Sequence, residues 1–408
     1  MIDVGKSMAD VRISNRAALL KLLYARGELS RKQLAGLMNL TPATITNIAA
    51  DLIDEQVLAE GPAKNGGTRS GRREVALTLN LKRFRVMCAY IAERKVAVYC
   101  MDLEGEEFFH ADLGFDDRIS GAGMVNSVCD HIQEYLNGLS SEARSRIIGI
   151  GMGIKGVFDP VGGVSIRSFG LWEDNLNVRE IVESRFDFKV HLNNNVRCIA
   201  NAQKLIHHNN GVRSLLFIKY GPLIGGALIM NGALFDGHGC QAMEVGHTVV
   251  DPGGPVCRCG KRGCLETIIG FDVMGKLLEL QYSRARTPIL HEITGGERTN
   301  IGMESILAAY DRGDQAVVDT VNRAIEYLAL ELINTIVIIN PELIVLYGRP
   351  FESGAFLERL EGEVRRIGGE SRSTVIMKSQ SNLRLDRFGC ASIVVKDFLD
   401  TGAVLTRP

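Results

Sequence analysis

The sequence contains no long apolar segment. No uninterrupted apolar run in its 408 residues reaches the roughly 18 residues that a membrane-spanning helix needs. The first residues also lack the apolar core of a secretory signal peptide. These absences argue against membrane insertion and secretion, and they predict a cytoplasmic protein.

An excess of charge and a disulfide framework are missing as well. The chain has 47 basic and 48 acidic residues, so any affinity for nucleic acid has to come from local charge. The cysteines number nine, and an odd number argues against a framework of disulfides. Three of them lie in one short stretch. The others are scattered among apolar neighbours, which predicts reduced core thiols at Cys88, Cys100, Cys129, Cys198, Cys240 and Cys390.

What is present begins with three helical segments near the N-terminus. A leucine-rich face ends at Gly27, Ser30 and Gln33 have the spacing of a capping box, and Thr41-Pro42 starts a third helix. Two short helices joined by a few residues form a helix-turn-helix, whose second helix enters the major groove by its N-terminal part. The residues expected at bases and phosphates are Arg31, Thr41, Ala43, Thr44, Thr46 and Asn47. The alternative is a small all-helical packing or protein-interaction module.

A glycine-rich basic loop follows at 64–73. It has no acidic residue and precedes the strand-like segment 75–79. Arginines spaced by glycine can follow a phosphate backbone or enter a narrow minor groove, so Arg69, Arg72 and Arg73 are predicted DNA contacts. Beside a helix-turn-helix, this loop predicts the hairpin of a winged helix over 1–82 that binds a double-stranded DNA operator. The alternative is a solvated linker between domains.

From about residue 84 the sequence alternates between apolar strands and helices. Strand candidates are 86–91, 96–101, 147–154, 215–218 and 343–346, and segments with helical spacing or length are 121–139, 178–185, 196–206, 270–280 and 315–339. This alternation is typical of an α/β architecture. It predicts two lobes with a ligand cleft between them, the first at 83–195 completed by 386–408 and the second at 196–385.

Four soft ligands lie close together in the second of these lobes. His247 is followed by Cys257, Cys259 and Cys264, and the intervening glycines allow the tight turns that bring all four around one ion. Three thiolates and one imidazole fill a tetrahedral zinc site and leave no position for an activated water, which favours a structural metal over a hydrolytic one. The alternatives are buried thiols with a core histidine, or a redox or zinc sensor.

The stretch that holds these ligands starts with Glu244-Val-Gly-His247 and ends with Cys257-Arg-Cys-Gly-Lys-Arg-Gly-Cys-Leu-Glu266. It resembles the motif of the ROK family (repressors, open reading frames and kinases). The resemblance covers nearly the whole chain and implies the two-lobed, actin-like, ribonuclease H-like fold of sugar kinases. The winged helix in front resembles the repressor branch of that family. The resemblance also implies that Glu244, His247 and Glu266 contact sugar hydroxyls, with one ring nitrogen of His247 left for zinc.

The resemblance does not extend to the catalytic base. Kinases of the family have an Asn-Asp pair at the start of a helix, and the aspartate takes a proton from the sugar. Here the pair is Asn194-Asn195. An amide cannot take a proton from a hydroxyl near neutral pH, but it can hydrogen-bond to one. Asn194 and Asn195 are therefore predicted to bind a sugar without phosphorylating it.

The segments that hold the nucleotide phosphates in those kinases also differ. The first, at 90–94, reads Tyr-Ile-Ala-Glu-Arg where those kinases have Asp-x-Gly-Gly-Thr, so it lacks both flexible glycines and adds a carboxylate. The second, at 221–226, has Pro222 and Leu223, and the third, ending at Gly348, keeps one glycine of two. These differences predict that ATP does not bind and that the chain is not an enzyme.

Two further residues near the expected cleft have more than one interpretation. Lys155 stands where the kinases mostly have a Pro-Gly turn, so it is either a contact for a phosphate or carboxylate on the effector or a surface lysine on a turn. Trp172, the single tryptophan, is either a stacking surface for a sugar ring or part of the lobe packing, and packing is favoured.

Together these features predict a transcriptional regulator, most readily a repressor of carbohydrate uptake or metabolism genes. A homodimer or homotetramer is expected because one winged helix seldom gives enough specificity. A sugar or sugar phosphate in the cleft is expected to change the affinity for DNA. Control by a protein partner such as a sugar transporter is the first alternative, and an active ROK sugar kinase is the second.

Overall fold

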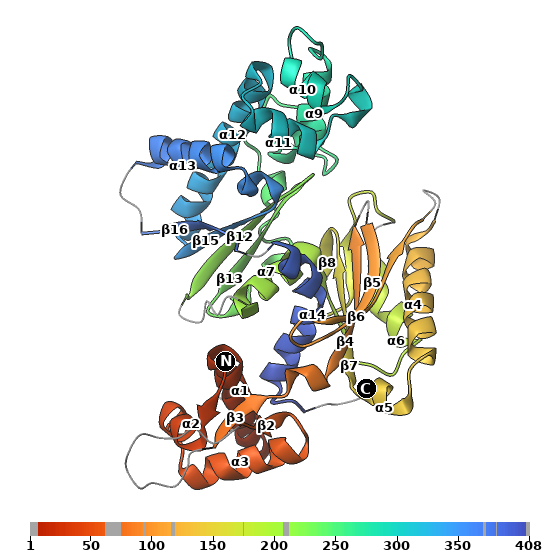
Figure 1. Cartoon of the computed structure of the whole chain (residues 1–408), viewed down its shortest axis with the longest axis vertical. Coiled ribbons are helices and arrows are strands. Elements are labelled where there is room, and N and C mark those ends of the chain that lie inside the picture. The colour runs from red at the N-terminus through yellow and green to blue at the C-terminus, as the bar shows by residue number, and fades with distance from the viewer. Residues whose placement is uncertain are drawn as a thin grey trace. The chain divides into compact units, whose positions relative to one another are not determined.

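The computed structural model describes residues 7–61, 75–92, 95–115, 119–173, 175–206, 212–369, 373–380 and 382–404. Contacts divide the chain into two compact units: unit 1 is Met1–Asn209 with Arg384–Pro408, and unit 2 is Asn210–Leu383. Figure 1 shows the elements of both units, coloured along the chain. Helix α7 (Asn195–Ile206) lies in unit 1 in this division, whereas the sequence assigned it to the second lobe. The limits of the three predicted domains stay a prediction.

Unit 1 begins with three helices and a small antiparallel sheet. The helices are α1 (Met8–Arg26), α2 (Arg31–Met38) and α3 (Pro42–Asp54), and the sheet has the order β1 (Leu29–Ser30), β3 (Ala76–Leu79), β2 (Leu58–Glu60). This is the winged helix-turn-helix arrangement that the sequence predicted. The predicted basic loop connects β2 to β3, but 62–74 lie outside the described residues, and with them Arg69, Arg72 and Arg73.

Local sequence signals set the ends of these helices. Ser30 Oγ accepts from the N–H of Gln33 (3.2 Å), and the Gln33 side chain accepts from the N–H of Ser30 (2.8 Å), which completes the predicted capping box. Asn39 ends α2 in the left-handed region (φ 52°), and Thr41 caps α3 with Pro42 in its first turn. The turn between α2 and α3 is therefore encoded in its own residues.

The rest of unit 1 is built around a five-stranded sheet with the order β11-β7-β4-β5-β6. Its strands are β4 (Arg85–Ala92), β5 (Lys95–Asp102), β6 (Glu107–Leu113), β7 (Ile147–Ile154) and β11 (Val190–Asn194). β4, β5 and β6 are antiparallel neighbours, whereas β7 and β11 continue from β4 as parallel strands. A smaller antiparallel sheet contains β8 (Val157–Asp159), β9 (Val164–Arg167) and β10 (Leu176–Asn177).

Helices cover this sheet. They are α4 (Gly121–Asn137), α5 (Ser141–Ser145), α6 (Val178–Glu183), α7 and the C-terminal α14 (Asn382–Asp400), and 3₁₀ turn η1 (Leu81–Arg83) precedes β4. Apolar residues of α4 and α6 share one core cluster with the strands. α14 comes so close to β7 that only glycine fits at Gly151, where a Cβ would lie 2.1 Å from the Cys390 carbonyl oxygen.

Unit 2 repeats the same sheet pattern. Its order is β14-β13-β12-β15-β16, formed by β12 (Ser214–Tyr220), β13 (Ile224–Met230), β14 (Ala233–Leu234), β15 (Leu343–Tyr347) and β16 (Val375–Lys378). Again three strands are antiparallel neighbours and two more continue in parallel. Two sheets with one topology confirm the predicted two-lobed, ribonuclease H-like architecture.

The helices of unit 2 surround a core of apolar residues from α9, α11, α12 and α13 and from the sheet. The α-helices are α8 (Glu266–Ile269), α9 (Phe271–Glu279), α10 (Pro288–Ile293), α11 (Met303–Asp311), α12 (Gln315–Ile339) and α13 (Gly354–Gly368). The 3₁₀ turns are η2 (His238–Cys240), η3 (Val245–His247), η4 (Arg298–Asn300) and η5 (Arg349–Glu352). In the part of the chain that the structure describes, no helix is long and apolar enough to cross a membrane.

One buried arginine ties the winged helix to the end of α14 within unit 1. Arg16 on α1 donates from Nε to the carbonyl oxygen of Gly402 (2.9 Å) and from both terminal nitrogens to the Glu55 carboxylate at the end of α3. Gly402 has a φ of +69°, and a Cβ there would lie 2.8 Å from Arg16 Cβ. Lys21 of α1 also pairs with Asp400 of α14 at 2.6 Å.

Candidate functional site

The four predicted metal ligands lie together in unit 2. His247 ends the 3₁₀ turn η3, and the three cysteines follow on a loop closed by two isolated β-bridges. One ligand atom from each of the four residues lies within 4.8 Å of the other three. Gly263 lets the loop close, because its φ is +64° and a Cβ there would lie 1.4 Å from the Asp251 carbonyl oxygen.

The separations between these atoms are close to those of a tetrahedral site. Cys259 Sγ lies 3.6 Å from Cys264 Sγ, and Cys257 Sγ lies 3.5 Å from His247 Nδ1. With Zn–S bonds of about 2.3 Å and Zn–N bonds of about 2.0 Å, a tetrahedron sets these separations at about 3.8 and 3.5 Å. Burial, and then the neighbouring thiols, raise the pKa of Cys264 to about 12. A cation at the centre would offset this cost of ionising the thiol. Three sulfurs and one imidazole nitrogen therefore fit a zinc ion.

The two carboxylates named by the resemblance flank this cluster. The carbonyl oxygen of Glu244 accepts from the N–H of His247 (2.8 Å), so both residues belong to one turn. Glu266 starts α8, its side chain is 12% exposed, and its Oε1 accepts from Arg258 Nη2 at 3.0 Å. A Cβ added to Gly246 would lie 3.5 Å from Glu266 Oε2. Because Gly246 lies between Glu244 and His247, Glu266 faces the same turn.

Arg258 is a residue that the sequence analysis missed. Arg258 lies between two of the candidate ligand cysteines and eight residues before Glu266. A positive charge at this place in the sequence could have indicated an ion pair with Glu266.

A second missed residue is Glu331 on α12, which is 4% exposed. Its Oε1 accepts from Thr248 Oγ1 (3.2 Å) and from Thr335 Oγ1 (3.1 Å), and burial raises its pKa. Since Thr248 follows His247, Glu331 anchors the segment that carries the four candidate ligands, 247–264, to α12.

Asn194 and Asn195 lie in unit 1, at the start of α7. Asn194 Oδ1 accepts from the N–H groups of Val196 (2.8 Å) and Arg197 (3.2 Å), so it caps the helix. Its Nδ2 donates to the Gly156 carbonyl oxygen at 2.6 Å. The amide of Asn194 is therefore largely engaged within the protein, with one N–H left to donate to a ligand.

Asn195 is hydrogen-bonded to Tyr90. The sequence analysis considered Tyr90 only as the start of a segment that lacks two glycines. Asn195 Nδ2 donates to the Tyr90 hydroxyl of β4 at 3.1 Å, and the Asn195 side chain is buried. The tyrosine oxygen accepts this bond, so its own proton remains available for another acceptor. An amide is not basic near neutral pH, so Asn195 cannot take a proton from a sugar hydroxyl.

Structure distinguishes between the interpretations of Lys155 and Trp172. Lys155 is 8% exposed, so it is not a surface lysine on a turn. Trp172 is 9% exposed, and its indole N–H donates to Ser165 Oγ at 3.0 Å. A Cβ on Gly121 would lie 2.7 Å from Trp172, which shows how closely α4 approaches the ring. The packing interpretation of Trp172 is confirmed.

Of the three segments aligned with nucleotide-binding loops, the structure describes the second and third in full and the first in part. In the second, the N–H of Gly221 donates to the Leu223 carbonyl oxygen (3.0 Å). In the third, a Cβ on Gly348 would lie 1.9 Å from the Tyr220 carbonyl oxygen, so this glycine is required by packing against β12. In the first, Glu93 and Arg94 lie outside the described residues.

The predicted reading face of the winged helix is exposed at the start of α3. Ala43, Thr46 and Asn47 are exposed, and Thr44 is half-buried. Some polar groups are already used locally: Thr41 Oγ1 accepts from the N–H of Thr44 (3.2 Å), and Thr46 Oγ1 donates to the Pro42 carbonyl oxygen (2.8 Å). Asn47 makes no side-chain hydrogen bond within the described residues.

An ion pair restricts the side chain of Arg31. Its Nη2 lies 2.7 Å from Glu60 Oε1 on β2, so α2 is joined to the base of the wing. The guanidinium is partly exposed, and its remaining donors can still reach a phosphate.

A protein-family model named "ROK family" matches residues 116–392. The chain belongs to the ROK family. It is 23% identical over 403 residues to the DNA-binding transcriptional repressor Mlc of Escherichia coli K12, covering 97% of this chain and 96% of Mlc. It is 24% identical to the xylose repressor of Caldicellulosiruptor bescii, with 94% and 96% covered. Against the dual regulator NagC of Escherichia coli K12, identity is 24% and the covered shares are 85% and 83%.

Solved structures of the family share this fold. A ROK transcriptional regulator, a homologue of the Escherichia coli MLC protein, superposes with a TM-score of 0.79 at 23% identity, covering 97% of this chain and 98% of that chain. A ROK glucokinase from Streptomyces griseus, in complex with glucose and AMPPNP, superposes with a TM-score of 0.65 at 19% identity. It covers 76% of this chain and 98% of its own, so the kinase-like body is common to the regulator and the enzyme.

Proposed function

We propose that this chain is a DNA-binding transcriptional regulator, a repressor of carbohydrate uptake or metabolism genes that a sugar or sugar derivative controls. The observation that carries the proposal is the exposed start of α3 in a winged helix that is continuous with a kinase-like body. The likeness to Mlc, NagC and the xylose repressor extends over most of this chain and supports it. Ala43, Thr46 and Asn47 contact bases, and Arg31 with the basic loop contacts phosphates.

The kinase-like body binds its sugar without phosphorylating it. Asn195 donates a hydrogen bond to the Tyr90 hydroxyl where a base would be needed, Pro222 has no backbone N–H to offer a phosphate, and Gly348 is required by packing against β12. We infer that Glu244, His247 and Glu266 of unit 2 bind hydroxyl groups. In unit 1, the remaining N–H of Asn194 and the side chain of Asn195 are also inferred to bind hydroxyl groups. ATP is not expected to bind.

His247, Cys257, Cys259 and Cys264 hold a structural zinc ion in this proposal. When bound, the ion supplies positive charge that keeps the thiols ionised and joins η3 to the cysteine loop. With Nδ1 of His247 facing the thiols, Nε2 is the nitrogen that carries a proton for a sugar hydroxyl. The cluster thereby sets the tautomer of a sugar-binding histidine.

Fluorescence anisotropy on DNA from the protein's own promoter region tests the proposal. The protein is titrated with and without a panel of neutral and phosphorylated sugars, and tight binding relieved by one sugar is the expected result. Ala43→Glu is expected to abolish binding, whereas Ala308→Glu, on an exposed position of α11, keeps it. Binding that no sugar changes would favour control by a protein partner, and ADP release with any hexose would restore the kinase interpretation.

A further inference from the structure

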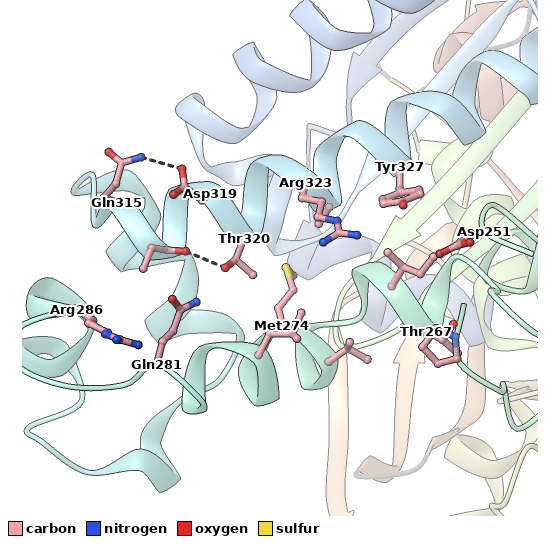
Figure 2. Close-up of a pocket in the computed structure, with 16 residues that line it drawn as sticks. Asp251, Thr267, Met274, Gln281, Arg286, Gln315, Asp319, Thr320, Arg323 and Tyr327 are labelled. Atoms are coloured by element: carbon pink, nitrogen blue, oxygen red, sulfur yellow. Dashed lines mark hydrogen bonds between the residues drawn. The ribbon is translucent and has the colours of Figure 1, made fainter. Parts of the chain in front are cut away.

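The helices of the two units differ in the space beside them. In unit 2, α9 and α12 leave a groove of about 830 Å³, whose lining includes Met274 from α9 and Thr320 from α12 (Figure 2). In unit 1, the cavity that α14 shares with β7 and β11 has a volume of about 20 Å³, little more than one water molecule needs. A helix packed without free space passes a displacement on to its neighbours. We therefore expect α14 to move together with the elements that it contacts.

Near its middle, α14 is joined to α7 by buried polar groups. Asn201 Nδ2 of α7 donates to the carbonyl oxygen (2.9 Å) and to the hydroxyl (3.1 Å) of Ser392 on α14. Ser392 Oγ also lies 3.0 Å from the carbonyl oxygen of Cys198 on α7. Asn201 is 2% exposed and Ser392 is 0% exposed, so water does not replace these bonds when they break. A Cβ on Gly389 would lie 3.4 Å from the backbone nitrogen of Ile199, so the backbones of the two helices are in close contact as well.

The start of α7 carries the two sugar ligands proposed in unit 1. Asn194 caps the helix, and Asn195 Nδ2 donates to the Tyr90 hydroxyl of β4 at 3.1 Å. Cys390 of α14 donates from Sγ to the carbonyl oxygen of Ala89 (3.2 Å), the residue that precedes Tyr90 on β4. The two elements that hold Asn195, α7 and β4, are therefore both in contact with α14.

The C-terminal end of α14 holds the winged helix. The N–H of Ala403 donates to the carbonyl oxygen of Phe398 (2.8 Å), which fixes the turn after α14 to the last turn of the helix. From this turn, the carbonyl oxygen of Gly402 accepts from Nε of the buried Arg16 on α1 (2.9 Å). A displacement of α14 therefore moves this acceptor relative to α1.

We propose that α14 couples the start of α7 to the winged helix, so that ligand binding at Asn194 and Asn195 changes how firmly Arg16 holds α1. The coupling runs from α7 through the Ser392 contacts and along α14 to the carbonyl oxygen of Gly402. From Ser392 to its end, α14 is one helix with a length of about 12 Å, and a packed helix shifts as a unit. A ligand drives this shift by binding one position of α7 more tightly than the other.

This inference rests on the proposed function, because it gives the route by which a bound sugar changes DNA binding. A second connection exists: the chain passes from β3 through η1 into β4, so a disturbance can also reach the winged helix along the backbone. Replacing Arg16 with methionine removes the side-chain contact with the end of α14 and leaves the backbone connection intact. A disturbance that reaches α1 through α14 is therefore lost in the Arg16→Met background.

The first experiment measures amide hydrogen exchange of α1 in the full-length protein. Ser392→Ala removes the hydroxyl contacts with α7 and is expected to accelerate exchange of α1 at least about threefold. In the Arg16→Met background, the same change is expected to alter exchange of α1 by less than about 1.5-fold. Exchange of the amides of β4, inside the five-stranded sheet, reports global unfolding in each variant.

Ser165→Ala is the matched control for this change. Ser165 on β9 is also 0% exposed, and its Oγ accepts from the indole N–H of Trp172 at 3.0 Å. The control thus removes a buried hydroxyl from unit 1 without changing a contact of α14. Exchange of α1 is expected to stay within about 1.5-fold of the wild type.

The second experiment starts at the other end of the route. Asn194→Ala removes the cap of α7 and is expected to accelerate exchange of α1 at least about twofold, but not in the Arg16→Met background. Asn177→Ala is the matched control, because Asn177 Oδ1 caps α6 by accepting from the N–H of Glu180 (3.2 Å). Loss of that cap is expected to leave exchange of α1 unchanged.

The results separate the two proposals. Unchanged exchange of α1 in Ser392→Ala or in Asn194→Ala would overturn α14 as the route, and so would an equal acceleration with and without Arg16. The regulator would still stand if a sugar of the panel relieved binding to promoter DNA. The expected pattern of exchange in a protein without affinity for its promoter DNA would support the coupling through α14 and remove the proposed function.

Discussion

Replacing Arg16 with methionine tests how the winged helix is held in unit 1. The substitution keeps most of the aliphatic volume and removes the guanidinium, which donates to the Gly402 carbonyl oxygen and to Glu55. The arginine side chain is 7% exposed, whereas the side chain of Glu55 is 44% exposed. The carboxylate can therefore become hydrated after the change, but the buried carbonyl loses its donor.

These contacts set the expected cost. An unsatisfied buried acceptor costs about 1–3 kcal/mol, and a half-exposed ion pair adds up to about 1 kcal/mol. We therefore expect the opening free energy of the winged helix to fall by about 2–3 kcal/mol, which corresponds to exchange faster by about 30- to 150-fold at 1.4 kcal/mol per tenfold. Amide hydrogen exchange of α1 and α3 measures this opening, and it avoids assuming two-state unfolding for a chain with more than one unit.

Arg12 provides a matched control on the same helix. It pairs with Asp51 of α3 one turn before Arg16 pairs with Glu55, but its side chain is 63% exposed. Arg12→Met is therefore expected to change exchange by less than about fivefold. Equal effects from Arg12→Met and Arg16→Met would show that burial and the Gly402 carbonyl do not govern this contact, and the reasoning would be refuted.

Three further predictions concern the metal, the missing base and pH. The purified protein is expected to hold about one zinc ion per chain by elemental analysis. The Cys259→Ser variant is expected to hold no zinc and to lose protection from hydrogen exchange around η3. Asn195→Asp alone is expected to give no ADP release with hexoses, because the phosphate segments still differ, and activity in this single variant would contradict their proposed role. Burial lowers the pKa of His191 to about 4 from 6.5, and Asp397 offsets this shift only in part. Between these pH values the unfolded chain binds more protons than the folded chain, so the unfolding free energy is expected to fall as pH drops from 6.5 to 4. The fall is expected to be smaller in His191→Gln.

Features that depend on neighbouring residues could be predicted from the sequence. The capping box at Ser30, the start of α3 at Pro42 and the clustering of the four candidate metal ligands each depend on a short stretch whose turns are set by local residues. The strand candidates are also confirmed, because buried strands are continuous apolar runs. What these signals share is that a few neighbouring side chains decide the geometry.

Contacts between distant segments could not be predicted in this way. Asn195 and Tyr90 are 105 residues apart, and Arg16 and Gly402 are 386 residues apart. Nothing in either local pattern names the partner, because the fold alone brings the segments together. Asn194 is an intermediate case: an asparagine just before a helix was a readable cap, but the family motif drew attention to sugar binding instead.

Tyr90 and Asn195 form one of several differences between this chain and the kinases that share its fold. Where the resemblance places two aspartates, this chain has a phenol and an amide that hydrogen-bond to each other. Two carboxylates facing each other need a metal or a shared proton to offset their repulsion, and they attract the cations that accompany a nucleotide. The neutral pair needs neither. Under the proposed function, the same core keeps its sheets and its polar site without affinity for a magnesium nucleotide. We therefore predict that Tyr90→Asp with Asn195→Asp lowers the stability of unit 1 before it restores any catalysis.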